Sequence, residues 1–349
     1  MAALEAFWEF GWMERLYNWL LLKAIRGLGE VSIKRLWLGL GSVEAILSAS
    51  YEDLREVVGE EKARAIKRRE LSFEPEEVIR LVEREGIGWV CLEDEAYPAP
   101  LKEIEDPPPV LFYRGEIRQV PMIGIVGTRR PDSQSLSFIR SLVKEVVGRG
   151  YGVCSGGAVG CDFYSHKECL AFGGYTVCLL GMGILKIPSY LSRLQDGNML
   201  FLSEFLPEAG PEEYTFPRRN RLISGLSKAL VVAEAGQKSG SLITAQYAIK
   251  QKRPLWVYVG NALSQRWLGC INLVNEGKAK VLYSPTLLFQ DLPSSQSLKD
   301  SLLDLLTTPK TFDELLEITR LSPKDLIMRL TQLELEGKIL RNGSHYVSL

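Results

Sequence analysis

The sequence lacks the residue types on which most metal sites and nucleophilic active sites depend. Among its 349 residues there are only two histidines, His166 and His345, and the six cysteines include no Cys-x-x-Cys pair. A zinc site or a disulfide framework is therefore disfavoured, and we expect buried free thiols in a cytoplasmic protein. No serine lies in a nucleophile elbow, and no cluster of carboxylates offers a metal site. The sequence thus predicts no catalytic residues, no metal and no cofactor.

A large net charge and long hydrophobic runs are also absent. The net charge is -1, so any polyanion has to be bound by a local patch of the surface. The aromatic N-terminus does not fit a signal peptide, because Glu5 precedes it and no small-residue cleavage site follows. Glu9, Glu14 and Lys23 interrupt its apolar residues, so we expect no membrane span. The expected structure is an amphipathic helix that packs on its own domain, with a partner-binding arm as the alternative.

Length and hydrophobic patterning predict several domains, since 349 residues suffice for two or three. Residues 1–73 form short helical patterns separated by glycine turns, typical of a SAM-like or helix-hairpin-helix module or of a plain helical packing module. Residues 74–284 alternate apolar strands with helices, the pattern of a mostly parallel α/β sheet. A linker at 285–298 then leads to a winged-helix pattern at 299–349.

The first part of the sheet domain, residues 74–120, opens with a predicted helix over 75–85. Strands are expected at 88–92 and 110–113. Between them, the prolines of the stretch 97–109 lack backbone donors, and we expect an ordered linker without a regular element.

The last fifty residues predict a small helical unit with a hairpin. Thr311 and Glu314 form a capping box, a helix is expected over 323–336, and Asn342-Gly343 indicates a tight turn. The charged residues of the expected recognition helix are mixed in sign: Lys324, Asp325, Arg329, Glu334 and Glu336. Such a helix reads the major groove poorly, so we favour a protein-contact or dimerisation role over duplex binding.

A basic run stands out at 216–227, with the sequence Phe-Pro-Arg-Arg-Asn-Arg-Leu-Ile-Ser-Gly-Leu-Ser. No acidic residue occurs between Tyr214 and Ala233, so the arginines have no carboxylate close in sequence. Guanidinium groups match phosphate oxygens in a bidentate geometry, and an asparagine amide adds an uncharged donor. A polyanion is therefore the expected ligand, and a solvated basic turn is the alternative.

Three glycine-rich loops follow apolar strands and precede helices, at 127–132, 155–160 and 236–241. In an open α/β sheet such loops gather at the carboxyl edge, where helix N-termini bind anions. None of them is a dinucleotide fingerprint or a P-loop, and each by itself is compatible with ordinary turn chemistry. Together with the basic run and the cations Arg129 and Lys238, they predict phosphate binding.

Asp162 and His166 lie four residues apart on one face of a predicted helix. This spacing fits an acid–base pair, but it fits a capping carboxylate and a structural imidazole equally well. We favour the structural interpretation.

Together, these motifs resemble the DprA/Smf family of DNA-processing proteins, from about Gly27 to the C-terminus. The segments that carry the resemblance are 125–129, 155–162, 203–204, 216–227 and 239–245, with Gly269 and Asn272. The resemblance implies an extended Rossmann-like sheet beside the helical and winged-helix modules. It further implies a non-enzymatic protein that binds single-stranded DNA, helps to load the RecA recombinase during natural transformation, and commonly forms a homodimer.

The predicted phosphate-binding residues come from the three loops and the basic run. They are Gly127, Thr128, Arg129, Ser155, Gly156, Gly157, Phe216, Arg218, Arg219, Asn220, Arg221, Lys238, Ser239, Gly240 and Ser241. Of these, the resemblance itself implies a pocket of Arg129, Ser155, Gly156, Phe216, Arg219, Asn220, Lys238 and Ser239. One departure is Val159, which stands where the family usually has an arginine.

Two other classes of function remain open. A nucleotide-binding hydrolase on a related Rossmann-like fold needs an acidic residue that faces the sugar, such as Glu204, Glu234 or Asp162. The Pro-Gly-Gly-x-Gly-Thr loop expected of such hydrolases is absent, however. A transcription factor would use the winged helix, whose recognition helix carries acidic residues. Single-stranded DNA binding is the interpretation that we favour.

Overall fold

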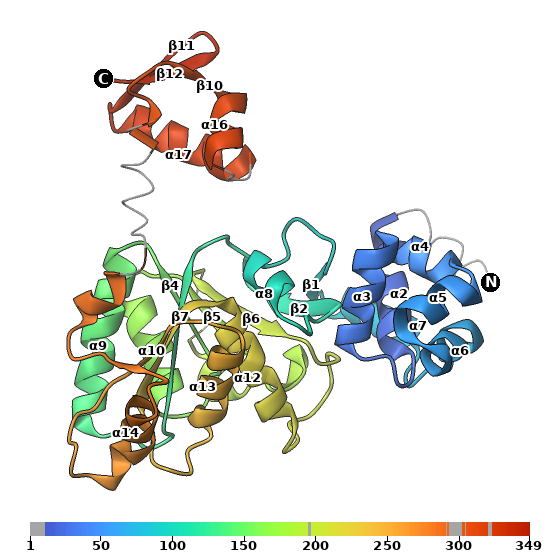
Figure 1. The fold of residues 1–349 in the computed structure, drawn as a ribbon, viewed down its shortest axis with the longest axis horizontal. Coiled ribbons are helices and arrows are strands. Elements are labelled where there is room, and N and C mark those ends of the chain that lie inside the picture. Colours follow the sequence, from blue (N-terminus) through green and yellow to red (C-terminus); the bar gives the residue numbers. More distant parts are fainter. Residues whose placement is uncertain (1–10, 195–196, 291, 293–301, 304, 320–322) are drawn as a thin grey trace. The chain divides into compact units, whose positions relative to one another are not determined.

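The computed structural model describes residues 11–349 except 195–196, 291, 293–301, 304 and 320–322. The first ten residues of the aromatic N-terminus and part of the expected linker at 285–298 lie outside the described residues. The chain divides into two units, Met1–Pro285 and Thr286–Leu349, shown in Figure 1. Each unit is considered by itself.

The first unit begins with short helices, as the sequence predicts. They are α2 Gly11–Ala24, α3 Glu30–Leu40, α4 Val43–Ser48, α5 Tyr51–Val58 and α6 Glu60–Arg68. Local chemistry sets their limits: Ser50 and Asp53 form a capping box at α5, and Gly59, at φ +83°, separates α5 from α6. The helices share one continuous hydrophobic core with the sheet that follows, so the domain boundary at residue 73 stays a prediction.

The segment that leads into the sheet contains one element that the sequence analysis did not expect. Helix α7 (Pro75–Arg84) and strands β1 (Gly88–Cys91) and β2 (Val110–Arg114) confirm the predictions. A short helix, α8 (Ala99–Glu103), nevertheless forms inside the proline-rich stretch. Its proline lies in the first turn, where the backbone nitrogen has no helical acceptor to bond, so proline costs nothing there.

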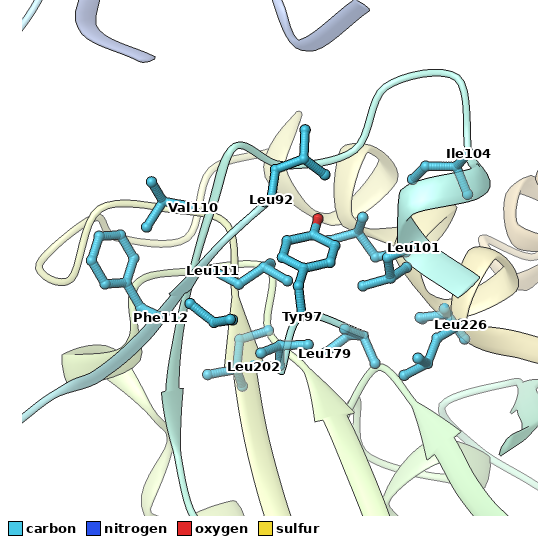
Figure 2. Packing of buried hydrophobic residues seen from close by; sticks show 14 of the residues in the cluster. Leu92, Tyr97, Leu101, Ile104, Val110, Leu111, Phe112, Leu179, Leu202 and Leu226 are labelled. Atoms are coloured by element: carbon cyan, nitrogen blue, oxygen red, sulfur yellow. The ribbon is translucent and has the colours of Figure 1, made fainter. Parts of the chain in front are cut away.

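The proline-rich stretch is also pinned by a buried tyrosine. Tyr97 is fully buried, and its hydroxyl donates a 2.9 Å hydrogen bond to the carbonyl of Pro108. Figure 2 shows its ring among Leu92, Leu101 and Leu111. Burial raises the pKa of this phenol well above its ordinary value, so it stays a neutral donor.

Within the described residues the central sheet has nine strands, in the order β1-β2-β6-β5-β4-β3-β7-β8-β9. At one edge, β1 pairs antiparallel with β2, and β2 pairs antiparallel with β6. The other seven strands, β6, β5, β4, β3, β7, β8 and β9 in sheet order, run parallel to one another. The bounds of the parallel strands are β3 Met122–Gly127, β4 Gly152–Ser155, β5 Thr176–Leu179, β6 Met199–Ser203, β7 Ser227–Glu234, β8 Leu255–Val257 and β9 Lys280–Val281. The large, mostly parallel α/β sheet predicted from the sequence is therefore confirmed.

Helices connect the parallel strands. They are α9 Ser133–Gly148, α10 Cys161–Ala171, η2 Ile184–Lys186, α11 Ser189–Ser192, α12 Thr215–Leu226, α13 Ser241–Lys250, η3 Gln265–Trp267 and α14 Leu268–Asn275. A further short helix, η4 Pro285–Phe289, follows the last parallel strand. The chain moves from β3 outward to β6 and then returns to β7 on the other side of β3. This reversal makes β3 a topological switch point, where ligands bind at the carboxyl ends of the strands.

The second unit is a winged helix with its own core. Its elements are β10 Lys310–Thr311, α16 Phe312–Thr319, α17 Pro323–Leu335, β11 Ile339–Asn342 and β12 His345–Ser348. Leu315, Leu330 and Leu333 are buried in its centre. The predicted capping box is confirmed, since Thr311 N donates to Glu314 Oε2 (2.7 Å) and Glu314 N donates to Thr311 Oγ1 (3.3 Å).

All six cysteines are free and buried, as predicted. Burial raises the pKa of the Cys154 and Cys178 thiols to about 12, which keeps them protonated and unreactive. In the described part of the chain, no group of three or more metal-ligating side chains is found. Nor does any described helix combine the length and apolar composition that crossing a membrane requires.

Candidate nucleic-acid interface

A pocket of about 1230 Å³ opens where the carboxyl ends of the parallel strands meet the first turns of α12. The loops after β3, β4, β5 and β7 all contribute to its wall. Of the predicted site residues, it brings together Gly127, Thr128, Arg129, Gly156, Gly157, Phe216, Arg219, Asn220, Ser239, Gly240 and Ser241. The pocket thus lies at the switch point of the sheet, the position expected from the three glycine-rich loops.

The basic run is a helix, and helical geometry divides its arginines between two faces. Phe216, Arg219 and Asn220 are spaced i, i+3 and i+4 on α12 and line the pocket. Arg218 and Arg221 are three residues apart on another face and do not line it. The structure therefore separates residues that the sequence analysis had grouped as one phosphate-binding run.

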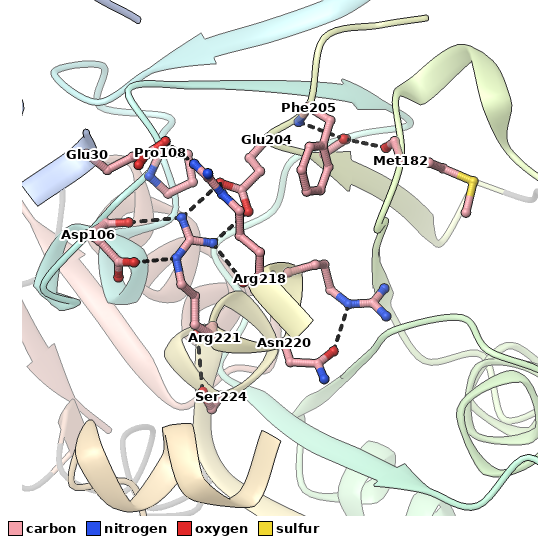
Figure 3. A network of polar contacts seen from close by, with 12 residues as sticks. Glu30, Asp106, Pro108, Met182, Glu204, Phe205, Arg218, Asn220, Arg221 and Ser224 are labelled. Atoms are coloured by element: carbon pink, nitrogen blue, oxygen red, sulfur yellow. Dashed lines mark hydrogen bonds and ion pairs between the residues drawn. The ribbon is translucent and has the colours of Figure 1, made fainter. Parts of the chain in front are cut away.

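Arg221 is held by a buried ion-pair network, drawn in Figure 3. Its Nη1 and Nη2 donate to the two carboxylate oxygens of Glu204 at 2.6 and 2.8 Å, and its Nε donates to Asp106 Oδ2 at 2.7 Å. The Arg221 and Glu204 side chains are only 3% and 1% exposed. Burial raises the pKa of the Glu204 carboxyl, but Arg221, through its charge and hydrogen bonds, and the charges of Arg218 and Lys23 together more than offset burial, so the pKa is lowered.

Arg218 belongs to the same network. It pairs with Glu30 of α3 and, at 3.4 Å, with Glu204. Both arginines are thus neutralised although no carboxylate lies close to them in sequence, because the fold brings distant carboxylates to them. Both lie outside the pocket lining, and we assign neither of them to phosphate binding.

Arg219, in contrast, lies in the pocket wall with no carboxylate within ion-pairing distance in the described part of the chain. It is 5% exposed, and its Nη1 donates to the carbonyls of Gly156 (2.6 Å) and Leu179. Burial lowers the pKa of its guanidinium from the ordinary value, although it remains a cation. Its Nε donates to Asn220 Oδ1 at 3.1 Å, so Nη2 is the guanidinium nitrogen without a hydrogen-bond partner among the described residues. A buried cation with free donors in a pocket wall is suited to an anion.

Glycine is required beside this guanidinium. A Cβ on Gly156 would lie 2.7 Å from Arg219 Nη2 and 2.8 Å from the Asp162 carboxylate. Gly157, at φ +74°, and Gly160, at φ +94°, also need glycine, and a Cβ on Gly160 would lie 2.4 Å from the carbonyl oxygen of Thr128. The loops after β3 and β4 are therefore packed against each other as one unit.

Asp162 and Ser155 support these loops through hydrogen bonds, and Asp162 also lines the pocket. Asp162 Oδ2 accepts a hydrogen bond from Gly156 N (3.1 Å), and Ser155 Oγ donates to the carbonyl of Ile125 (2.6 Å). Ser155 is fully buried and does not line the pocket, so its predicted contact with phosphate lacks support. Lys238 is also outside the lining, but its side chain is exposed.

His166 has the structural role that we favoured. It is fully buried, and its Nδ1 lies 2.7 Å from Thr176 Oγ1, while its Nε2 has no partner among the described residues. Burial lowers the pKa of this imidazole to about 3, with Arg219 contributing in the same direction. The ring is therefore neutral at physiological pH.

This buried imidazole predicts a pH dependence of stability. The unfolded chain binds a proton at His166 below about pH 6.5, whereas the folded chain does so only near pH 3. The free energy of unfolding should be unaffected by His166 above pH 6.5 and should fall by about 1.4 kcal/mol per pH unit below it. Urea unfolding between pH 7 and pH 5 should show a steeper loss for the wild type than for His166→Gln. Parallel pH profiles would contradict this assignment.

The sequence analysis missed several residues of the pocket. Lys186 and Tyr190 line it from the segment after β5, and the Tyr190 hydroxyl donates to the carbonyl of Gly157 at 2.9 Å. The sequence does contain a signal for this part of the pocket, because Gly181-Met182-Gly183 is a fourth glycine-containing loop that follows an apolar strand. Glu212 and Glu213, just before α12, also line the pocket.

The carboxylates that a hydrolase would need have other partners. Glu234 accepts hydrogen bonds from Asp132 N (2.7 Å) and Arg266 Nη1 (2.9 Å). Glu204 is paired with Arg221, and Asp162 holds the Gly156 amide. This arrangement favours binding over hydrolysis.

The fold and the site define a Rossmann-like α/β protein with a winged-helix domain and a pocket walled by glycine-rich loops. Residues 88–293 match the family model of DNA recombination-mediator protein A, and residues 290–343 match that of the DprA winged helix domain. The chain belongs to the DprA/Smf family.

Two relatives align with this chain over about two thirds or more of both proteins. It is 34% identical over 294 residues to Protein Smf of Synechocystis, and this alignment covers 77% of this chain and 71% of that protein. It is 36% identical over 241 residues to the DNA processing protein DprA of Bacillus subtilis, covering 66% and 81%.

Two solved structures are similar. The X-ray structure of Streptococcus pneumoniae DprA has a TM-score of 0.69 at 29% identity and covers 79% of this chain and 97% of that one. The Helicobacter pylori DNA processing protein A, whose structure concerns its single-stranded DNA binding mode, has a TM-score of 0.52 at 28% identity. It covers 61% of this chain and 96% of that one.

Proposed function

We propose that this protein is a non-enzymatic binder of single-stranded DNA that acts in the cytoplasm and grips the phosphate backbone in the pocket described above. The observation that carries the proposal is Arg219, a buried cation with free donors among glycine-rich loops. The single-stranded DNA binding of the Helicobacter pylori relative supports it.

In this proposal, charge and backbone amides do most of the binding. Arg129, Lys186 and Lys238 are exposed cations on or beside the pocket, and loop residues Gly127, Thr128, Gly156, Gly157, Ser239, Gly240 and Ser241 surround the phosphates. Val159 is exposed where the family usually has an arginine, so that loop contributes amides and no charge. The ring of Phe216, which has Arg219 6.0 Å from its centroid, offers a surface for base stacking, and Asn220 adds an uncharged donor.

The proposal is tested by the anisotropy of a labelled oligothymidine and of a matched duplex over a salt series. Single-strand binding loses about 0.7 in log–log slope per phosphate neutralised, so a footprint of about five phosphates predicts a slope of about -3.5. Preference for the single strand with a slope of that size supports the proposal. Negligible oligothymidine binding at low salt would contradict it.

A binder of phosphates should be indifferent to base sequence. Lys238→Ala removes an exposed cation beside the pocket, so we expect a loss of about 0.7 in salt slope and the same loss of affinity for every sequence. Titrations of oligothymidine, oligocytidine and a mixed sequence measure both quantities. A variant that changes base preference counts against phosphate binding at this site.

We further propose that the protein delivers the bound strand to the RecA recombinase and works as a homodimer. The match to the family of DNA recombination-mediator protein A supports this role. The assay is RecA filament formation on DNA already coated by a single-strand-binding protein, with sedimentation to give the oligomeric state. Filaments that form no faster with this protein would contradict the loading role.

A further inference from the structure

A second pocket, of about 440 Å³, opens beside α9 where β8 and β9 end. Its lining consists of three serines, one glutamine, three aromatic residues and one proline: Ser133, Gln134, Ser137, Phe138, Ser141, Tyr258, Tyr283 and Pro285. We call it the aromatic pocket. None of these eight side chains carries a charge, so the aromatic pocket suits an uncharged planar group and not a phosphate.

The rings of the aromatic pocket form a surface on which a base can stack. Phe138 of α9 and Tyr258 are stacked, with ring centroids 4.0 Å apart and planes 8° from parallel. Phe138 is buried, so it holds the half-buried Tyr258 ring in place, and Tyr283 adds a ring that is 77% exposed. Nucleobases bind to such rings whatever their sequence, because every base has a flat π-face. The exposed amide of Gln134 adds a donor and an acceptor for the edge of a base.

Trp267 packs against the aromatic pocket from inside the protein. Its ring meets Tyr258 edge-on, with centroids 6.4 Å apart. Gly260 lets it come close to Gln134, since a Cβ on Gly260 would lie 2.7 Å from the Trp267 ring and 2.8 Å from Gln134 Oε1. Trp267 is 1% exposed, and its Nε1 has no hydrogen-bond partner among the described residues. A buried donor of this kind is rare in a folded protein and marks a place where water or a ligand supplies the acceptor.

One loop joins the aromatic pocket to the pocket that holds Arg219. Residues 127–129 line the Arg219 pocket, and residues 133–134 line the aromatic pocket. Between them, Arg266 Nη1 donates to the carbonyl of Arg130 (2.9 Å), and Asp132 caps α9 by accepting from the amide at position 134 (2.9 Å). The Arg130 side chain is exposed. A strand that leaves the Arg219 pocket along this loop therefore meets a further cation before it reaches the aromatic pocket.

We infer that the aromatic pocket is a nucleobase subsite for a strand whose phosphates are held in the Arg219 pocket; this inference rests on the proposed function. In the sheet order β3-β7-β8-β9, Tyr258 and Tyr283 follow strands that are two and three positions from β3. Strands are about 4.8 Å apart, so the distance along the sheet edge is roughly 10–14 Å. Stacked nucleotides rise about 3.4 Å each, so about three or four of them span this distance. Only a strand longer than the footprint of the Arg219 pocket can fill both.

The experiment measures the binding of three labelled strands by the wild type and by Tyr283→Ala. The strands are an oligothymidine of about 18 nucleotides, one of about six that fills the Arg219 pocket alone, and an abasic strand as long as the first. The abasic strand keeps the phosphates and lacks the bases. We expect Tyr283→Ala to weaken the long oligothymidine about fivefold or more, the loss of one stacking contact, and to change the other two less than about twofold.

Two further variants serve as controls. Tyr283→Phe keeps the ring and should bind all three strands as the wild type does. Leu38→Ala removes a side chain of α3 that is 67% exposed and lies outside the lining of both pockets, and it should leave all three affinities unchanged. Because Tyr283 is exposed, its loss should not unfold the chain, and thermal melting of each variant verifies this.

An unchanged affinity of Tyr283→Ala for the long oligothymidine overturns the nucleobase subsite. Equal losses on the long oligothymidine and on the abasic strand overturn it as well, because the contact then does not involve a base. A wild-type protein that binds neither oligothymidine overturns the proposed function itself, which is a distinct result because it needs no variant.

Discussion

Arg219→Ala is expected to weaken oligothymidine binding by roughly 10- to 100-fold. A hydrogen bond from a charged donor contributes about 1.5–3 kcal/mol, and each 1.4 kcal/mol corresponds to a factor of ten. Arg219 is the buried cation of the pocket, and its Nη2 has no partner among the described residues, so its loss removes both charge and directed donors. Arg219→Lys should recover the charge but only part of the affinity, because lysine lacks the planar fork.

The matched control for this variant is Arg218→Ala. It removes the same charge from the neighbouring position of the same helix, but Arg218 is engaged with Glu30 and Glu204 outside the pocket. We expect it to change oligothymidine affinity by less than about threefold, because a charge outside the pocket acts on the DNA only through a weak, salt-screened interaction. Equal losses from both variants would mean that the helix acts only through its net charge, contrary to the pocket as described.

Arg221→Ala is expected to lower the free energy of unfolding by about 3–5 kcal/mol, the cost of leaving one member of a buried ion pair without its partner. Glu204 is 1% exposed and, among the described residues, would keep Arg218, at 3.4 Å, as its one ion-pair partner. Glu204→Ala should have a similar effect for the same reason. Urea unfolding measures each loss, and oligothymidine binding of the folded fraction should change far less.

A double-mutant cycle distinguishes this network from independent contacts. Removing both Arg221 and Glu204 should cost clearly less than the sum of the two single losses, because no unpaired charge is then left in the pair. Glu103→Ala provides the contrast. Glu103 pairs with Arg253, but its side chain is 65% exposed, so the loss of this ion pair should lower the free energy of unfolding by about 1 kcal/mol or less. Strictly additive losses for Arg221 and Glu204 would contradict the coupling.

Much of the fold could be predicted because its signals are local. Apolar runs such as Met122–Gly127 and Ser227–Glu234 are buried on both faces of a parallel sheet, so they appear in the sequence as continuous hydrophobic segments. Glycine-rich loops behind such strands must gather at one sheet edge, whatever else the chain does. The position of the pocket therefore followed from the order of strands and loops.

The division of the basic run could not be predicted in the same way. Treated as a list of charges, Arg218, Arg219 and Arg221 are equivalent, and only the helical period sets them on different faces. The carboxylates that neutralise Arg221 come from Glu204 and Asp106, which are 17 and 115 positions away in the chain. The absence of acidic residues nearby in sequence says nothing about such partners.

Amide hydrogen exchange with and without oligothymidine tests the central claim, that the pocket itself grips the DNA. The account predicts slower exchange of the loop amides at 127–129, 156–159 and 239–241 when the oligonucleotide binds, with less protection in Arg219→Ala. Binding that leaves these amides unchanged and instead protects α17 of the winged helix would place the DNA site elsewhere and contradict the account.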